Sequence, residues 1–245
     1  NASNCKKIFK WIKYNNNWNC KVTNISNEFS LLAVQGPLSR KTLKKLFNKD
    51  IDLNFYNHKT IEYNQEHIFI SRTGYTGELG YEILVNSTTA IKIWRGLIKL
   101  GVTPCGLAVR DVLRIEMKYC LYGNDINEDI TPIEAGLNWI VKFSKEFIGK
   151  KKLLNQKKNG ISKKIIGFKM VDKCIPRHGY KLFSEKKEIG FVTSGTFSIG
   201  LKQGIGMAYV ESKFQDKDIF LSIRGKRKKG RVVNSSFITE TSLHD

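Results

Sequence analysis

The stretch ISRTGYTGELGYEILV, residues 70–85, joins two β-rich runs through glycines at every third position, Gly74, Gly77 and Gly80. Glycine takes positive φ, or lets another group approach the backbone, at no steric cost. We therefore expect a tight hairpin here. No Lys-Ser or Lys-Thr pair follows the glycines and no helix begins at the last of them, so the stretch does not match a phosphate-binding loop.

Glu82 is the charged residue of the second β-rich run, where it follows Tyr81 and precedes Ile83. A carboxylate inside an apolar strand needs a compensating partner, or it faces a ligand that needs it. An alternating strand would also place a lone glutamate on its solvent face, which is the commoner arrangement. The residue alone leaves both interpretations open.

Three strings occur in order along most of the chain: RTGYTGELGYE at 72–82, GLAVRDVLRIEMKYCLYGNDINEDITPIEAGLNWIV at 106–141, and IPRHGY at 175–180. Together they resemble the glycine cleavage system T-protein family of tetrahydrofolate-dependent aminomethyltransferases. The resemblance implies transfer of a one-carbon unit to tetrahydrofolate, the co-substrate, with release of ammonia. The unit would come from an aminomethyl group on the lipoyl arm of the glycine cleavage H-protein, the expected partner.

The resemblance also implies an α+β fold, in which a folate-binding cloverleaf is followed by a small C-terminal antiparallel β-barrel. We expect the folate-binding domain at residues 1–146, a linker helix at 147–160 that ends at Gly160, and the barrel at 161–245. The sequence independently favours a barrel, because short β-rich runs separated by polar or glycine turns follow Gly160. These runs lie at 165–171, 180–183, 188–194, 204–210, 219–223 and 230–233.

The resemblance carries over to five folate-binding positions. Glu82 matches the carboxylate that binds the pterin, whose amide N–H and exocyclic amine present two parallel donors. Arg114 matches a folate-binding arginine, and a rigid guanidinium fork suits an anionic ligand. Tyr75, Tyr122 and Arg177 match positions that line the folate channel, although structural packing would explain each of them as well.

Without the resemblance, Arg114 would be interpreted as a surface charge or as an ion pair with Asp111 or Glu116. It lies in an expected helix at 106–118. A second helix is expected at 87–100, capped by Ser87 or Thr88. Its inner stripe is expected to hold four apolar residues. They are Ile91, Trp94, Leu97 and Ile98.

Earlier in the chain, the spacing of apolar residues predicts an amphipathic helix over residues 1–14, with Ser3 placed to cap it. Short β-rich runs follow at 22–26 and 29–35, and a helix is expected from Gly36-Pro37 to about residue 47. The helix at 1–14 opens with NASN, which resembles an internal segment of the family.

The catalytic carboxylate of the family is an aspartate from a GGxxDD-like segment upstream of that helix. We therefore expect an N-terminally truncated family member with no catalytic residue in this chain, and slow or no aminomethyl transfer by these 245 residues alone. If the catalytic carboxylate lay in this chain, the candidates would be Asp111, Asp125 and Glu134. A second departure follows the last barrel strand, where Ser235, Ser236 and Phe237 replace the Pro-Phe of the family.

The net charge of +20 could indicate nucleic-acid binding. The lysines are spread along the chain without interleaved aromatic residues, so we interpret most of this charge as solvated surface and expect no nucleic-acid partner. A basic surface would still attract polyanionic folate and an acidic protein partner.

The five cysteines are odd in number and include no C-x-x-C pair, and the four histidines are scattered. We therefore expect reduced cysteines and no metal site. The sequence shows neither an apolar signal segment nor a run of eighteen apolar residues, which predicts a cytoplasmic protein with no membrane contact.

Three alternatives remain. A folate-binding protein of iron–sulfur cluster maintenance would carry a KGCYxGQ-like motif, whereas residues 142–150 read KFSKEFIGK and contain no cysteine. The folate-binding half of a sarcosine or dimethylglycine dehydrogenase would need a flavin-binding region. A non-catalytic basic RNA-binding protein would bind RNA with strong salt dependence and would not bind folate.

Overall fold

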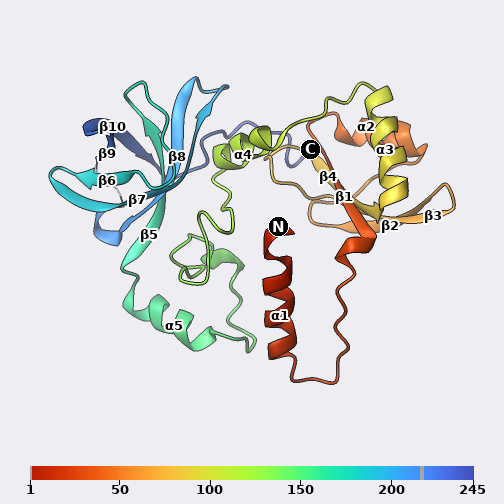
Figure 1. Cartoon of the computed structure of the whole chain (residues 1–245), viewed down its shortest axis with the longest axis horizontal. Coiled ribbons are helices and arrows are strands. Elements are labelled where there is room, and N and C mark those ends of the chain that lie inside the picture. Colours follow the sequence, from red (N-terminus) through yellow and green to blue (C-terminus); the bar gives the residue numbers. More distant parts are fainter. Residues whose placement is uncertain (1, 216–217) are drawn as a thin grey trace. The chain divides into compact units, whose positions relative to one another are not determined.

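A computed structural model describes residues 2–215 and 218–245. It divides into two compact units, one up to Pro104 together with Thr241–Asp245, and one spanning Cys105–Glu240. Figure 1 labels their elements. Helix α4 (Leu107–Glu116) packs against strands β7 (Lys187–Ser198) and β8 (Gln203–Glu211) of the barrel, and it therefore belongs to the second of these compact units.

The first unit is built on a four-stranded antiparallel sheet in the order β1-β4-β3-β2. Its strands are β1 (Phe29–Gln35), β2 (His58–Tyr63), β3 (Glu66–Ser71) and β4 (Gly80–Asn86). Helices α2 (Ser39–Phe47) and α3 (Ser87–Lys99) contact the sheet and each other, and lie together in Figure 1.

Strand β4 alternates as its sequence predicts. Tyr81, Ile83 and Val85 are buried in the core of this unit, whereas Glu82 and Leu84 are not. Because successive side chains of a strand point to opposite faces, Glu82 lies on the face away from the core. Leu84 and its cross-strand neighbours Leu31 and Phe69 form an exposed apolar row on this face.

The expected hairpin is present, but its connection is the loop at residues 72–79 and not a tight turn. Of the three glycines, Gly77 has a positive φ of 80°. Gly74 and Gly80 instead allow another group to approach the backbone closely, because a Cβ at either position would overlap the side-chain amide of Gln35. That amide donates from Nε2 to the carbonyl oxygens of Thr73 and Tyr81, both at 3.2 Å.

The expected inner stripe of helix α3 is wrong for three of its four residues. Leu97 is buried, but Ile91, Trp94 and Ile98 are 54%, 47% and 42% exposed. The buried face instead consists of Thr89, Ala90, Ile93 and Leu97. The helix is capped one residue earlier than expected, since the side chain of Asn86 accepts from the Thr89 amide at 2.9 Å.

Helix α1 (Cys5–Asn15) follows a short 3-10 helix, η1 (Ala2–Asn4), and Asn1 lies outside the described residues. The N-cap is Asn4 and not Ser3. None of the residues of α1 is buried, and Ile8, Trp11 and Ile12 are exposed. The strand expected at 22–26 does not form; the 3-10 helix η2 (Ser26–Glu28) leads directly into β1.

The second unit contains the expected barrel, closed in the order β10-β5-β8-β7-β6-β9. Its remaining strands are β5 (Lys163–Met170), β6 (Lys181–Ser184), β9 (Ile219–Ile223) and β10 (Lys226–Val233), with η4 (Ser212–Phe214) between β8 and β9. All neighbours are antiparallel. Strands β6 and β9 pair through Leu182–Leu221 and Phe183–Phe220.

Between α4 and the barrel, the chain forms the 3-10 helix η3 (Asn138–Ile140) and helix α5 (Lys150–Asn159). Helix α5 begins three residues later than the expected linker helix and ends, as predicted, at Gly160 with a φ of 83°.

Candidate functional site

In the first unit, Glu82 is half-buried and lies opposite Ala33 on β1 and Ser71 on β3. Its Oε2 atom accepts a hydrogen bond of 2.5 Å from Thr73 Oγ1, which also lies 2.9 Å from Ser71 Oγ. A carboxylate has about four acceptor sites, and this contact uses one of them. Glu82 is therefore oriented by the protein and keeps acceptor capacity for further donors.

Tyr75 lies in the same glycine loop as Thr73 and is half-buried. Thr76, its neighbour, donates from Oγ1 to Gln35 Oε1 at 3.2 Å, so Gln35 contacts the loop through both ends of its amide. The loop that carries Tyr75 is thus tied to β1 as well as to β4.

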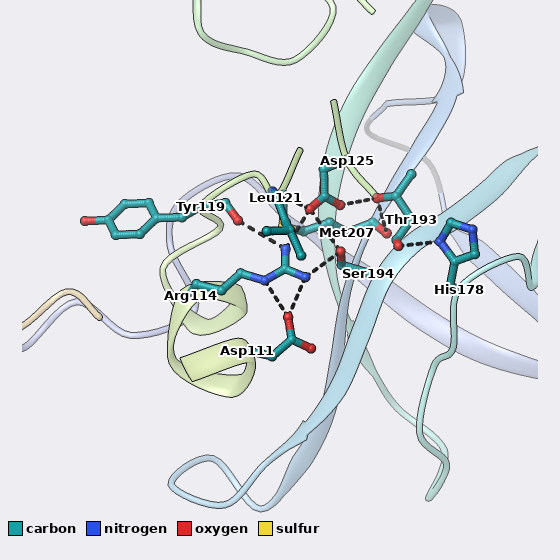
Figure 2. A network of polar contacts seen from close by, with 9 residues as sticks. All are labelled: Asp111, Arg114, Tyr119, Leu121, Asp125, His178, Thr193, Ser194 and Met207. Atoms are coloured by element: carbon teal, nitrogen blue, oxygen red, sulfur yellow. Dashed lines mark hydrogen bonds and ion pairs between the residues drawn. The ribbon is translucent and has the colours of Figure 1, made fainter. Parts of the chain in front are cut away.

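In the second unit, Arg114 is 1% exposed and all three nitrogens of its guanidinium donate to protein acceptors. Nε donates to Asp111 Oδ1 at 2.8 Å. Nη1 donates to Asp125 Oδ2 at 2.6 Å and to the Tyr119 carbonyl at 3.2 Å. Nη2 donates to Ser194 Oγ at 2.8 Å and lies 2.8 Å from Asp111 Oδ1 (Figure 2).

Asp125 is the centre of this network (Figure 2). Its Oδ2 accepts from Arg114, from Ser194 Oγ at 2.9 Å and from the Leu121 amide at 2.9 Å. Its Oδ1 accepts from Thr193 Oγ1 at 2.5 Å. Four donors fill the acceptor capacity of a carboxylate, which explains how this charge is tolerated with a side chain 0% exposed.

A bulge in β7 makes two of these contacts possible. Thr193 and Ser194 are consecutive, and a regular strand would point them to opposite faces. The pairing of β7 with β8 shifts register between Val192 and Ser194, and such a shift re-aims side chains. Both hydroxyls therefore reach Asp125.

The segment 175–180, which carries Arg177, is held against the same bulge. His178 Nδ1 lies 2.7 Å from the Thr193 carbonyl oxygen. A carbonyl only accepts, so Nδ1 carries the proton of this hydrogen bond. Arg177 is exposed. The β7 bulge thus anchors this segment through the backbone of Thr193.

Tyr122 follows Leu121 and is half-buried in the segment after α4. The turn closes through the Gly123 amide, which donates to the Ile126 carbonyl at 2.8 Å, and through the Leu121 amide on Asp125. Tyr122 is therefore positioned by the network around Asp125.

Burial also shifts the pKa values of two side chains in the segment after α4, Cys120 and Lys118. Burial raises the pKa of the Cys120 thiol from 9.0 to about 12, and the charge of Asp125 acts in the same direction. Burial lowers the pKa of Lys118, which donates to the carbonyls of Val233 and Asn234 at 3.2 and 2.8 Å. Both shifts have the same main cause, the burial of the segment that follows α4.

The three carboxylates named as fallback catalytic candidates all have protein partners. Asp111 and Asp125 are bound to Arg114. Glu134 is buried, and its Oε2 accepts from the amide and hydroxyl of Thr131 at 2.8 and 3.0 Å. These contacts give each carboxylate a structural role.

Of the five expected folate-binding residues, Glu82 and Tyr75 lie in the first unit, and Arg114, Tyr122 and Arg177 lie in the second. Within the second unit, the network around Asp125 and Thr193 connects the segments that carry the latter three. Sequence reasoning missed the residues that hold this arrangement. They are Thr73, Gln35, Thr193, Ser194 and His178.

Over residues 2–215 and 218–245, no cluster of histidine, cysteine and carboxylate side chains has the composition of a metal site. Within the same residues, no helix has the length and apolarity needed to span a membrane.

Two family matches cover most of the chain. Residues 1–145 match the GCVT N-terminal domain, and residues 163–238 match the glycine cleavage T-protein C-terminal barrel domain. The chain belongs to the glycine cleavage T-protein family. The resemblance inferred from the three sequence strings is confirmed, as is the α+β fold with a C-terminal barrel. Members of this family use tetrahydrofolate as the co-substrate of aminomethyl transfer.

Individual T-protein relatives agree. Aminomethyltransferases of Halothermothrix orenii and Thermosipho melanesiensis are each 46% identical over 97% of this chain, which spans 69% and 66% of their lengths. The crystal structure of glycine cleavage system aminomethyltransferase T from Bartonella henselae is 34% identical, with a TM-score of 0.89, over 97% of this chain and 67% of that one. The chain thus spans about two thirds of these relatives.

Proposed function

We propose that this chain binds tetrahydrofolate through Glu82 as part of an aminomethyltransferase of the glycine cleavage system. The proposal rests on the environment of this carboxylate. Glu82 is half-buried, its Oε2 atom accepts a hydrogen bond from Thr73, and it can accept further hydrogen bonds from a ligand. The pterin ring offers an amide N–H and an exocyclic amine as parallel donors, and a fixed carboxylate accepts such a pair well.

Tyr75 would contribute a ring surface close to this carboxylate, since both belong to the hairpin around the glycine loop. When bound, tetrahydrofolate supplies the nitrogen that accepts the one-carbon unit. The residues of this chain would orient it, and orientation is a large part of what a transfer between two bound molecules requires.

Arg114 has a different proposed role from the one expected from the family resemblance. Each nitrogen of its guanidinium already donates to a protein acceptor, which supports a positioning role for Arg114. We propose that Arg114 holds the segment that carries Tyr122. Ligand contact by Tyr122 and Arg177 stays a prediction.

The proposed donor of the one-carbon unit is the lipoylated H-protein. The net charge of +20 would favour association with an acidic partner through long-range attraction. Because the chain spans about two thirds of its relatives, we assign the binding step to these residues and the complete transfer to a chain of the relatives' full length. A cytoplasmic location is part of the proposal.

Calorimetric titration with tetrahydrofolate tests the role of Glu82. Glu82→Gln keeps the size and removes the charge, and the loss of a charge-assisted hydrogen bond costs about 1.5–3 kcal/mol, or roughly ten- to hundredfold in affinity. Glu62→Gln is the matched control, an exposed glutamate on β2 of the same sheet. Equal affinities of Glu82→Gln and the unchanged chain would remove Glu82 from the site.

A further inference from the structure

The segment Thr241–Asp245 belongs to the first unit, although the preceding residues belong to the second. Ser242 is 8% exposed and makes three contacts with the end of the glycine loop. Its amide donates to Glu78 Oε2 at 3.0 Å, and its hydroxyl donates to the same oxygen. Its Oγ accepts from the Leu79 amide at 3.0 Å. Bonds to a charged carboxylate are among the stronger hydrogen bonds in proteins.

The next residue holds the start of the loop. The Leu243 carbonyl accepts from Arg72 Nη2 at 3.1 Å, while Nη1 of the same arginine donates to the Leu53 carbonyl at 3.0 Å. Arg72 is 6% exposed. Two consecutive residues, Ser242 and Leu243, therefore bind the two ends of the loop at residues 72–79.

Further contacts fix the segment itself. The Asp245 carbonyl accepts from Arg40 Nη1 at 3.0 Å, and Arg40 Nε donates to the Tyr81 hydroxyl at 3.0 Å. The His244 ring packs edge-on against Phe55, with ring centroids 5.2 Å apart. The segment is thus attached to several elements of the first unit and can hold the loop in one conformation.

We propose that Thr241–Asp245 fixes the glycine loop in the conformation that binds folate, with Ser242 and Glu78 as positioning residues. The loop carries Thr73, which orients Glu82, and Tyr75. Holding both ends of a loop reduces the conformational freedom that ligand binding would otherwise have to remove. This inference rests on the proposed function, since it assigns the loop to the folate site.

Two readouts on the same variants test the inference. The first is amide hydrogen exchange without ligand at Arg72 and Gly36, whose amides donate to Asn57 and Leu79 and secure the loop ends at 2.8 and 2.7 Å. The second is tetrahydrofolate affinity by calorimetry. Ser242→Ala removes the hydroxyl contacts, and Glu78→Gln weakens the same contact from the loop side. Ser235→Ala, an exposed serine outside the segment, is the control.

We expect both variants to speed exchange at these two amides about tenfold and to weaken folate binding about five- to tenfold, with barrel strand β8 and the control unchanged. Unchanged exchange would overturn the inference, as would faster exchange with unchanged affinity. A failure of the proposed function can be told apart from a failure of this inference. If the proposed function is wrong, the unaltered chain binds no folate, whereas amide exchange at Arg72 and Gly36 still reports whether the segment holds the loop.

Discussion

Arg114 Nη1 and Asp125 Oδ2 lie 2.6 Å apart, and neither side chain is more than 1% exposed. A buried ion pair adds little net stability relative to apolar residues, but breaking it leaves an uncompensated charge. Here the pair also connects α4, the segment with Tyr122 and the bulge of β7. We therefore expect loss of this ion pair to lower the stability of the whole second unit.

Asp125→Asn removes the charge at nearly constant volume and leaves Arg114 without its buried partner. We expect the free energy of unfolding of the second unit to fall by about 3–5 kcal/mol. Asp111→Asn is the control, because the Asp111 side chain is 49% exposed and its loss should cost about 1 kcal/mol or less. Denaturant titration of both variants measures this, and equal losses would contradict the central role of Asp125.

Arg114→Lys separates a positioning role from direct ligand contact. Lysine keeps the charge but has three donors in place of five, so some of the four acceptors now bound by Arg114 lose their partner. We expect a loss of about 1–3 kcal/mol in stability, together with weaker folate binding. A variant that keeps full stability and still loses folate binding would instead indicate that Arg114 touches the ligand.

Gly80→Ala should destabilise the first unit, because the added Cβ overlaps the Gln35 amide. Overpacking of this kind costs about 1–3 kcal/mol. The double variant Gln35→Ala/Gly80→Ala removes the obstacle and should be more stable than the sum of the single changes predicts. Additive effects in thermal unfolding would show that the overlap is relieved by a small shift.

Cys120 should resist alkylation at pH 7 to 9, whereas the exposed Cys20 reacts. The thiolate is the reactive form. A pKa of about 12 leaves roughly one thiolate in a thousand at pH 9, and burial slows access further. Mass-spectrometric mapping after iodoacetamide treatment compares the two sites. Equal labelling of folded protein would show that the segment after α4 opens readily.

The barrel and the alternating strand β4 could be predicted from sequence, because each depends on local patterns of apolar and turn residues. The face of α3 could not. Ile91, Trp94 and Ile98 fit a helical stripe as well as Ala90, Ile93 and Leu97 do, and spacing alone does not say which stripe meets the sheet. The Asn86 cap and the packing against β1 and β4 decide it.

The polar network had no sequence signal for a different reason. Asp125 binds Thr193 and Ser194, which follow it by nearly seventy positions in the sequence. The two hydroxyls reach the same carboxylate because of a bulge in β7, and the sequence of the strand does not predict that bulge. Ser242 and Glu78, which are also in contact, are separated by even more positions in the sequence. Local sequence patterns predict helices and strands. They do not predict these contacts, which form only when helices and strands that are distant in sequence pack together.

The short pairing of β6 with β9 has a consequence for association between molecules. In the described residues these strands share two residue pairs, while every other neighbouring pair in the barrel shares four or more. The Arg227 guanidinium of β10 lies 3.1 Å from the Phe183 ring centroid on β6, and so reaches across this junction. Thermal opening should begin there, exposing two strand edges that can pair with another chain. Self-association of warmed protein would then proceed through β6 and β9, and its rate would depend on Arg227.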